Sequence, residues 1–549
     1  MFTPSSRLRA LLSLTTALSL AAPAFAQTST ATPPARVGQV ADVSGNVSFN
    51  GAGSNGQWVA ATPNYPVTTG DSLFTQSNSQ AALAIGSSQI SLAPNTEVQL
   101  TELDDTRVAA TQSQGETYLR ITDLQPGQDY TIATPRGVVT ITQDGAYDIT
   151  AGDAGTPTTL AVLYGAAAIG QLQVPAGQEG YLSGTSSQTT AQLGPLQQDS
   201  FMQSITAQMA PPPPPYAPPV VQQMTGVGEL SNYGDWSQSP QYGAVWYPNV
   251  APGWAPYREG HWAYVAPWGW TWVDAEPWGF APFHYGRWVQ YGGRWGWVPA
   301  AYSPGGYGPV YQPVYAPAVV NFVGLGAGVA ITASLLSQGS IGWVPLAPDE
   351  PYYPCYHTDH DYLRRINRVD VRNYQQININ NYHTLVVNHY VDRSGATFIP
   401  AQDMARGAPV ANYGRPIPGR IFAQAHPMPG DFNRALRPNF SPPPAPAPRP
   451  GNFAQHRAPP PMVISHQPVP PQFHPQAPMP QVHSPTQQFH PPMQQQFHPP
   501  MQQQFHPPVQ QQFHPPVQQQ FHPPMQQQFQ PPAAPRPPAP PHLPGNGKP

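Results

Sequence analysis

The sequence predicts a mainly β protein with two β-rich domains and a long C-terminal tail. Short runs that alternate apolar and polar residues, broken by Gly, Asn and Asp, fill residues 37–195 and are typical of strands. Every tryptophan except Trp58 lies in residues 231–360, where paired motifs indicate hairpins. The 77 prolines and 47 glycines, with only 9% charged residues, indicate much loop and disorder as well.

The N-terminus has the layout of a cleavable signal peptide. Arg7 and Arg9 precede an apolar run at 11–22 that is too short to span a bilayer, and the Ala-Phe-Ala motif ending at Ala26 is typical of a cleavage site. We therefore expect cleavage near Ala26, followed by a linker at 27–36. This signal peptide predicts a protein that is located in the periplasm or cell envelope, or that is secreted. An amphipathic first helix or an uncleaved anchor is the alternative.

Residues 37–195 predict one all-β domain. Leu83 and Ile85 fall two apart, as do Ile90 and Leu92, which places each pair on one face of a strand. The same alternation recurs up to the end of this segment, so there are enough strands for one compact core.

Five spaced elements of this domain resemble the extracytoplasmic FecR-like domain over about residues 37–170. They are GDSLFT at 70–75, AALAIGSSQISLAPNTEVQL at 81–100, GETY at 115–118, IATPRGVVTI at 132–141 and GAYDI at 145–149. The resemblance implies a solenoid-like or β-roll domain that relays a signal from an outer-membrane receptor in sigma-factor regulators. Those regulators place an anti-sigma segment and a membrane helix before the domain. Here a signal peptide precedes it, so we do not expect direct signalling to a sigma factor.

Residues 196–230 predict a linker between two domains. Five consecutive prolines at 211–215, followed by Pro218 and Pro219, favour an extended polyproline II spacer.

An internal duplication in residues 231–360 predicts a small antiparallel domain of repeated β-hairpins. GWAPYREGHW at 253–262 aligns with GFAPFHYGRW at 279–288, and PWGWTWV at 267–273 is echoed by RWGWVP at 294–299. Ala266-Pro267 and Gly292-Gly293 fall where turns would join the strands. The stretch resembles a Trp-rich domain of unknown function that often follows FecR-like domains, and the resemblance implies no activity.

Two segments after the hairpins have more than one interpretation. Residues 318–336 have the length and apolarity of a membrane span, but Asn321 and glycines at alternate positions favour packed strands, so we expect no stable transmembrane span. Residues 361–410 predict an Asn-rich β extension, because ININNYHTLVVNHYV alternates apolar residues with polar ones.

Residues 411–549 predict a disordered tail rich in Pro, Gln and His. Apolar periodicity is lost, and no acidic residue follows Asp431. An octapeptide, FHPPMQQQ or FHPPVQQQ, recurs through 489–528. We expect weak metal binding by these histidines, and adhesion to anionic envelope polymers below about pH 6.5, where histidine becomes charged.

Five tryptophans are the candidate ligand-binding residues: Trp254, Trp262, Trp270, Trp288 and Trp297. Exposed indole rings stack on the apolar faces of sugars, so an aromatic row on a sheet would suit a polysaccharide. The alternative, which carries more weight, is that these rings form the core. With Cys355 as the only cysteine, the domain depends on buried apolar area for its stability.

The residue pattern favours no enzyme, cofactor or metal site. Glu259, Asp274 and Glu276 would have to converge in a groove to hydrolyse a sugar, and the duplication retains none of them. The cluster from Cys355 to Asp361 has metal-ligating residue types but no distant second pair, so a solvated loop is the better interpretation.

These features predict a non-catalytic exported cell-envelope protein with a binding or structural role. The partners that we expect are envelope polysaccharide or envelope proteins, contacted through the Trp-rich domain. A net charge of -4 argues against nucleic acid. The alternative is a periplasmic sensory or regulatory FecR-like module without its own membrane helix. A carbohydrate hydrolase is a lesser alternative.

Overall fold

A computed structural model describes residues 33–436 except 55, 186–187, 209–212, 326–338, 357, 378–392, 423–425 and 428–435. The predicted signal peptide and the octapeptide repeats lie outside these residues. So does nearly all of the alternating ININNYHTLVVNHYV segment. The described residues all belong to one compact unit.

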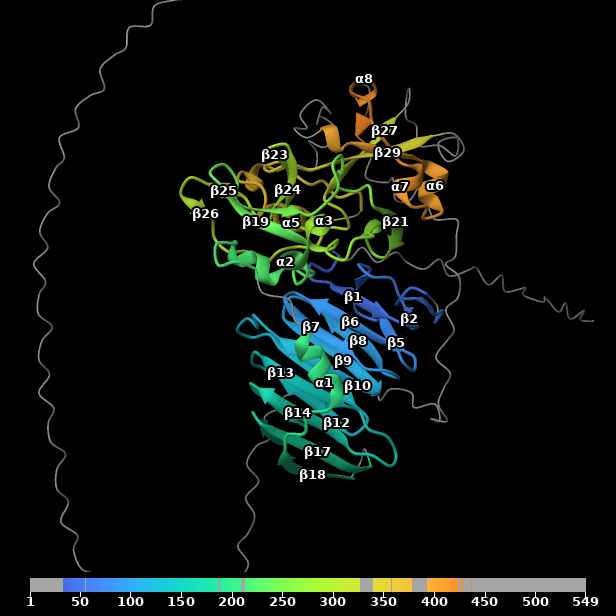
Figure 1. The fold of residues 1–549 in the computed structure, drawn as a ribbon, viewed down its shortest axis with the longest axis vertical. Helices are drawn as coiled ribbons and strands as arrows, with labels where there is room; N and C mark the ends of the chain where they lie inside the picture. Colours follow the sequence, from blue (N-terminus) through green and yellow to red (C-terminus); the bar gives the residue numbers. More distant parts are fainter. Residues whose placement is uncertain are drawn as a thin grey trace, which may run out of the picture. The chain divides into compact units, whose positions relative to one another are not determined.

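The predicted mainly β fold is confirmed, and its N-terminal part consists of two nine-stranded sheets (Figure 1). In spatial order the first sheet contains β18 (Gln188–Pro195), β17 (Gln178–Thr185), β14 (Thr158–Tyr164), β13 (Gly145–Thr150), β10 (Glu116–Ile121), β7 (Ser88–Leu92), β6 (Gln80–Ile85), β1 (Gly38–Ser44) and β4 (Pro66–Val67). The second contains β16 (Leu172–Pro175), β15 (Ala166–Ile169), β12 (Gly137–Ile141), β11 (Asp129–Thr134), β9 (Arg107–Gln114), β8 (Glu97–Leu103), β5 (Ser72–Thr75), β2 (Val47–Asn50) and β3 (Val59–Ala60). From β5 onward the chain mostly alternates between the sheets two strands at a time. We call this part the N-terminal sandwich.

The core of the N-terminal sandwich lies between its two sheets. Leu83 and Ile90 pair across β6 and β7 of the first sheet, and they share one apolar cluster with Ile132 and Val139 of the second. The period-two pattern in the sequence therefore identified the buried faces. Helix α1 (Ser200–Ala207) packs on the first sheet, since its Phe201 shares a small apolar cluster with Tyr118 of β10 and Ala146 of β13.

The segment 196–230 is not the solvated spacer that its prolines predicted. It contains α1 and the 3-10 helix η1 (Pro219–Gln223), and Val221, Met224 and Leu230 are buried in the tryptophan-rich core. Apolar residues that follow the prolines explain the difference, because burying them offsets the cost of ordering the chain.

We call the described residues after η1 the tryptophan-rich part. It contains three small sheets and a five-stranded sheet. The four-stranded sheet has the order β19 (Gly234–Ser239), β20 (Gly243–Pro248), β24 (Arg294–Val298), β23 (Arg287–Tyr291), and the two hairpins are β21 (Gly260–Val265) with β22 (Gly269–Asp274) and β25 (Tyr302–Ser303) with β26 (Gly306–Tyr307). The five-stranded sheet has the order β30 (Arg415–Pro416), β29 (Thr397–Pro400), β28 (Ser340–Pro345), β27 (Val320–Leu325), β31 (His426–Pro427). The short helices are α2 (Leu230–Tyr233), α3 (Ala281–His284), α5 (His360–Asn367), η2 (Tyr374–Gln376), η5 (Arg393–Gly395), α6 (Ala401–Ala405), α7 (Val410–Tyr413) and α8 (Gly419–Phe422).

Both predicted hairpins are present. β21 pairs with β22 and β23 with β24, in antiparallel register. Gly292 and Gly293, which join β23 to β24, have φ of 62° and 78°. A two-residue turn with both residues in the left-handed region has the twist that adjacent strands need, and glycine adopts it without strain.

Three segments differ from the sequence predictions. The expected β extension at 361–410 begins as helix α5, because Asp359 caps it by accepting a hydrogen bond from the Tyr362 N–H and Leu363 and Ile366 face the core. The expected tail is ordered at its start, since Phe422 and Leu436 are buried. Residues 318–336 have the apolarity of a membrane span, and their described part contains strand β27. Among the described residues, no helix is long and apolar enough to cross a bilayer.

The N-terminal sandwich and the tryptophan-rich part are joined by buried hydrogen bonds. The Asn64 side chain donates to the backbone oxygens of Asp274, at 3.1 Å, and Glu276, at 2.7 Å. The hydroxyl of Thr225 accepts from the Gly86 N–H at 2.8 Å. Both parts belong to one compact unit, and these bonds connect them.

Candidate functional site

Four of the five candidate tryptophans are core residues. Trp262, Trp270, Trp288 and Trp297 are each at most 1% exposed. They lie in one apolar cluster with further buried indoles, and many of the rings meet edge to face, as Trp262 and Trp272 do at 5.4 Å between centroids. No face of these four rings is free for a sugar to stack on. The core interpretation of the tryptophan pattern is therefore the one that the geometry supports.

Trp254 is the candidate that keeps partial exposure. Its ring packs at 5.8 Å from Trp278 and at 5.5 Å from Trp288, on the edge of the same cluster. One half-buried ring does not form the predicted aromatic row.

The three carboxylates considered for catalysis lie in different environments. Asp274 is 4% exposed, and its carboxylate accepts hydrogen bonds from the indole N–H of Trp272 and the backbone N–H of Glu276. Burial raises the pKa of Asp274 well above its usual range. Glu259, by contrast, is exposed. The Asp274 carboxylate thus fixes the turn after β22.

The cluster around Cys355 is divided by its local structure. Cys355 is buried, whereas Asp359 is the N-cap of α5, and His357 lies outside the described residues. The described part of the chain contains no group of three or more His, Cys, Asp or Glu arranged to hold a metal ion.

A groove lined by tyrosines is the candidate binding site. It has a volume of about 240 Å³, and segments around 218–220, 300–311 and 368–374 form its walls. We call it the tyrosine groove, after the four half-buried rings of Tyr302, Tyr307, Tyr311 and Tyr374. A second hollow of about 300 Å³ shares Ala301, Tyr302 and Arg372 with it, so the concave surface continues past these residues.

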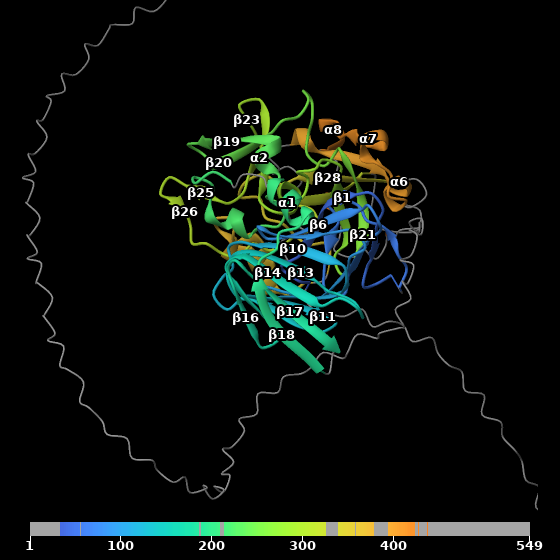
Figure 2. The same cartoon turned by 60° about the horizontal axis from the view of Figure 1, so that its bottom comes forward.

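The four rings form two pairs. Tyr302 and Tyr307 face each other across the β25–β26 hairpin, with centroids 5.2 Å apart, and that hairpin lies at the margin of the tryptophan-rich part in both views (Figure 1, Figure 2). Tyr311 and Tyr374 meet edge to face at 6.3 Å. The guanidinium of Arg368 lies 4.6 Å from the centre of the Tyr311 ring, a cation–π arrangement that helps to hold this ring in place.

A close approach of backbone fixes the first pair. The Tyr307 hydroxyl accepts a 2.6 Å hydrogen bond from the Ala244 N–H. Gly243 has a φ of 70°, and a Cβ there would lie 2.5 Å from the Tyr307 hydroxyl and 2.7 Å from the Tyr302 ring. Only glycine lets β20 start this close to the hairpin.

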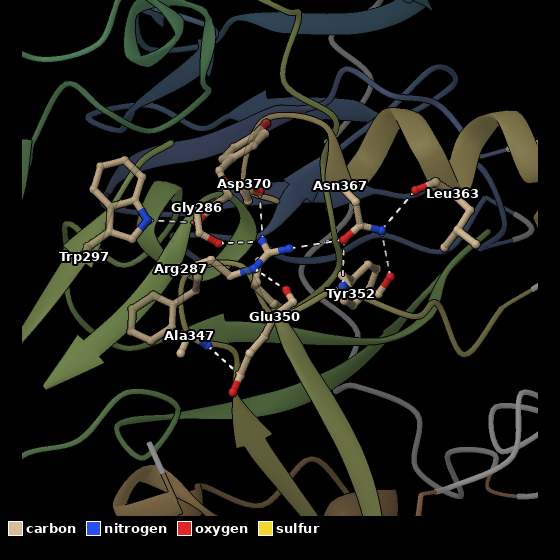
Figure 3. A network of polar contacts seen from close by, with 12 residues as sticks. Gly286, Arg287, Trp297, Ala347, Glu350, Tyr352, Leu363, Asn367 and Asp370 are labelled. Atoms are coloured by element: carbon tan, nitrogen blue, oxygen red, sulfur yellow. Dashed lines mark hydrogen bonds and ion pairs between the residues drawn. The ribbon is translucent and has the colours of Figure 1, made fainter. Parts of the chain in front are cut away.

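A buried arginine braces the opposite wall (Figure 3). Arg287 on β23 is 2% exposed, and its guanidinium donates to Asp370 at 2.8 Å and to the Asn367 side chain at 3.3 Å. It also donates to the backbone oxygens of Gly286, at 2.8 Å, and Glu350, at 3.0 Å. These bonds tie the segment that carries Arg368 and Tyr374 to the four-stranded sheet.

Asn367 extends this network to α5 and the loop before it. Its side-chain amide donates to the backbone oxygens of Tyr352 and Leu363, at 2.9 Å and 3.0 Å, and its oxygen accepts from the Tyr352 N–H at 2.7 Å (Figure 3). Burial raises the pKa of Asp370 to about 6, while the adjacent Arg287 opposes that rise. The network provides rigidity close to an exposed aromatic surface.

Sequence reasoning did not identify the tyrosine groove. Its rings come from segments far apart in the chain, and the tryptophans were the more prominent aromatic signal. The one local signal was the spacing of Tyr302, Tyr307 and Tyr311 among Gly and Pro. That spacing does not show which elements the rings would lie against.

Comparisons with known proteins identify part of the chain. Residues 227–350 match the model of a family of unknown function, DUF6600, in agreement with the resemblance expected at 231–360. No curated protein matches the chain.

Two crystal structures of a Parabacteroides distasonis protein, provisionally described as an anti-sigma factor, are similar to a quarter of the chain. Sequence identities are 10% and 11%, the coverage of this chain is 25%, and the TM-score is 0.21 in both cases. The matched part spans 63% and 62% of those two chains, which is less than two thirds of their length.

Proposed function

We propose that this chain is a non-catalytic exported cell-envelope protein that binds an extended polymer partner in the tyrosine groove. The observation that carries the proposal is that four half-exposed tyrosine rings line a groove, one wall of which is held in place by the buried Arg287–Asp370 network. Aromatic rings on a rigid scaffold supply a large contact area at little cost in conformational entropy. A groove that continues into a second hollow suits a strand better than a compact small molecule.

The site differs from the one expected from the sequence, although the domain is the same. The tryptophans stabilise the scaffold, and the tyrosines at its surface contact the partner. Glu259, Asp274 and Glu276 are not among the residues that line the groove. The proposal is therefore one of binding and not of hydrolysis.

A binding panel tests this function. The full-length chain is titrated with soluble peptidoglycan strands, envelope polysaccharide and a proline-rich peptide, and affinity is measured by calorimetry. Saturable binding of at least one polymer is expected, with a loss of about tenfold or more in a Tyr311→Ala variant. Tyr164→Ala, at a 51% exposed tyrosine of the N-terminal sandwich, is the matched control. Failure of every polymer to bind, or equal loss in both variants, would remove the proposal.

The proposal also includes export to the cell envelope and a relationship of the N-terminal domain to FecR-like domains. Export is supported by the residue pattern before Gln27, and N-terminal sequencing of the mature protein tests it, with Gln27 as the expected first residue. A relationship of 37–170 to FecR-like domains is supported by the five ordered motifs. If it extends to function, a sensory or regulatory role follows, and genes for a sigma factor and an outer-membrane receptor beside this one would favour that role.

A further inference from the structure

We propose that the partner of the tyrosine groove is the proline-rich octapeptide repeat of a second copy of this chain, residues 489–528. The inference rests on the proposed function, since it names the polymer that the groove binds. It predicts that the protein associates with itself through many weak, equivalent contacts.

The rings of the groove suit proline. A polyproline II strand makes no internal hydrogen bonds and presents its rings in a fixed conformation, and aromatic-lined grooves are the surfaces that recognise it. Here two tyrosine pairs, Tyr302 with Tyr307 and Tyr311 with Tyr374, line one groove. Each pair offers a site for a proline of the bound strand.

Three of the chain's own prolines form part of this surface. Pro218, Pro219 and Pro309 line the groove. The backbone of Pro218 has φ −62° and ψ 141°, which is the polyproline II conformation. Part of the groove wall is therefore itself a proline segment in the polyproline II conformation.

The hydrogen-bonding groups and the charge of the repeats also suit those of the groove wall. Proline has no N–H, so a proline-rich strand presents mainly carbonyl acceptors. Of the two arginines on the groove wall, Arg372 already donates to the Asp349 carboxylate, whereas Arg368 lies against the Tyr311 ring and carries only donors. The repeats contain no Lys or Arg, and their histidines are neutral above about pH 6.5, so no like charge opposes docking at neutral pH.

The number of repeats favours a partner in another molecule. The octapeptide occurs five times in succession between residues 489 and 528. A groove of about 240 Å³ holds only part of the five repeats. The remaining repeats are available to grooves of other copies, and multivalent contact of this kind gives strong association from weak individual sites.

Photo-crosslinking between two preparations of the full-length chain tests the inference. One preparation carries a photoreactive phenylalanine at position 311, and the other is uniformly labelled with 15N. After mixing and irradiation, crosslinked peptides are identified by mass spectrometry. Labelled peptides from 489–528 are expected, and the same photoreactive residue at position 164 should give none. Crosslinks to other segments, or to unlabelled repeats alone, would overturn the second-copy inference.

A second variant blocks the groove without removing a ring. Gly308 lines the groove, and a Cβ there meets no atom within 4 Å, so Gly308→Leu should fold and fill the space. Sedimentation of the full-length chain is expected to show concentration-dependent association that this variant and a free peptide of residues 497–512 both reduce by about tenfold or more. Association unchanged by both would refute the inference. If the peptide fails to bind but a glycan does, the inference fails and the proposed function stands.

Discussion

Arg287 and Asp370 form an ion pair at 2.8 Å in which both side chains are at least nine-tenths buried. The pair joins strand β23 to the segment after α5, and it lies behind the wall that carries Arg368 and Tyr374. A charge buried in this way is tolerated because every donor group of the guanidinium reaches an acceptor.

Removing one partner of this pair should unfold the groove wall. Arg287→Met leaves the Asp370 carboxylate buried without its cation, and we expect a loss of about 3–5 kcal/mol in the free energy of unfolding. Urea denaturation measures it. The exposed pair Arg364–Asp361 supplies the control, since Arg364→Ala should leave the urea midpoint unchanged within error. Equal midpoints for the two variants would mean that the buried network does not support the fold.

The close approach at Gly243 gives a second prediction. Gly243→Ala introduces a Cβ into the contact with Tyr302 and Tyr307, at a φ that disfavours alanine, so a loss of about 1–3 kcal/mol in stability is expected. Gly305→Ala, in the turn of the same hairpin, meets no atom within 4 Å and should be nearly neutral. Urea unfolding compares the two variants, and a Gly305→Ala variant as destabilised as Gly243→Ala would contradict the steric account.

A carboxyl cluster under helix α1 predicts that stability falls as pH rises. Burial, together with hydrogen bonding to Asp199, raises the pKa of Glu116 to about 8, and the buried Asp148 beside it is also shifted upward. The folded state therefore holds protons that the unfolded state has already released, so its stabilisation is present at low pH and is lost as pH rises through about 8.

Urea midpoints measured between pH 6.5 and 8.5 test this. The midpoint should fall across the range in the unmodified chain and change less in Glu116→Gln. His284, whose pKa burial lowers to about 3, differs in charge between the folded and unfolded states only below about pH 6.5 and does not interfere. Glu259→Gln, at an exposed glutamate, is the control and should keep the full slope. A slope that persists in Glu116→Gln would place its origin elsewhere.

The buried tryptophans predict a core role that mutation can measure. Trp262 contacts Trp272, Phe322 and Trp343, so Trp262→Ala should cost about 3–5 kcal/mol of stability. The emission of the native protein should be blue-shifted and only weakly quenched by acrylamide. Strong acrylamide quenching of the native protein, together with little loss of stability in Trp262→Ala, would mean that the indole rings lie at the surface and could contact a partner.

The sequence predicted the parts of the fold that are local. Period-two alternation identified strands such as β6 and β7, and the Gly292-Gly293 pair located a turn, because both signals depend on neighbouring residues. The burial of Val221 just after the proline run could not be predicted in this way, because the surfaces that cover it come from elsewhere in the chain. The tyrosine groove was missed for the same reason. One of its wall segments, 368–374, is held by the ion pair between Asp370 and Arg287, which lies 83 residues earlier in the chain.

The most direct test of the central claim is an NMR titration of the full-length chain, with 13C-labelled tyrosine rings, by the peptide of residues 497–512. The account predicts saturable shifts confined to Tyr302, Tyr307, Tyr311 and Tyr374, with none at Tyr164, and no shifts when the four prolines of the peptide are replaced by alanine. Binding without any change at these four rings, or equal binding of the alanine peptide, would contradict it.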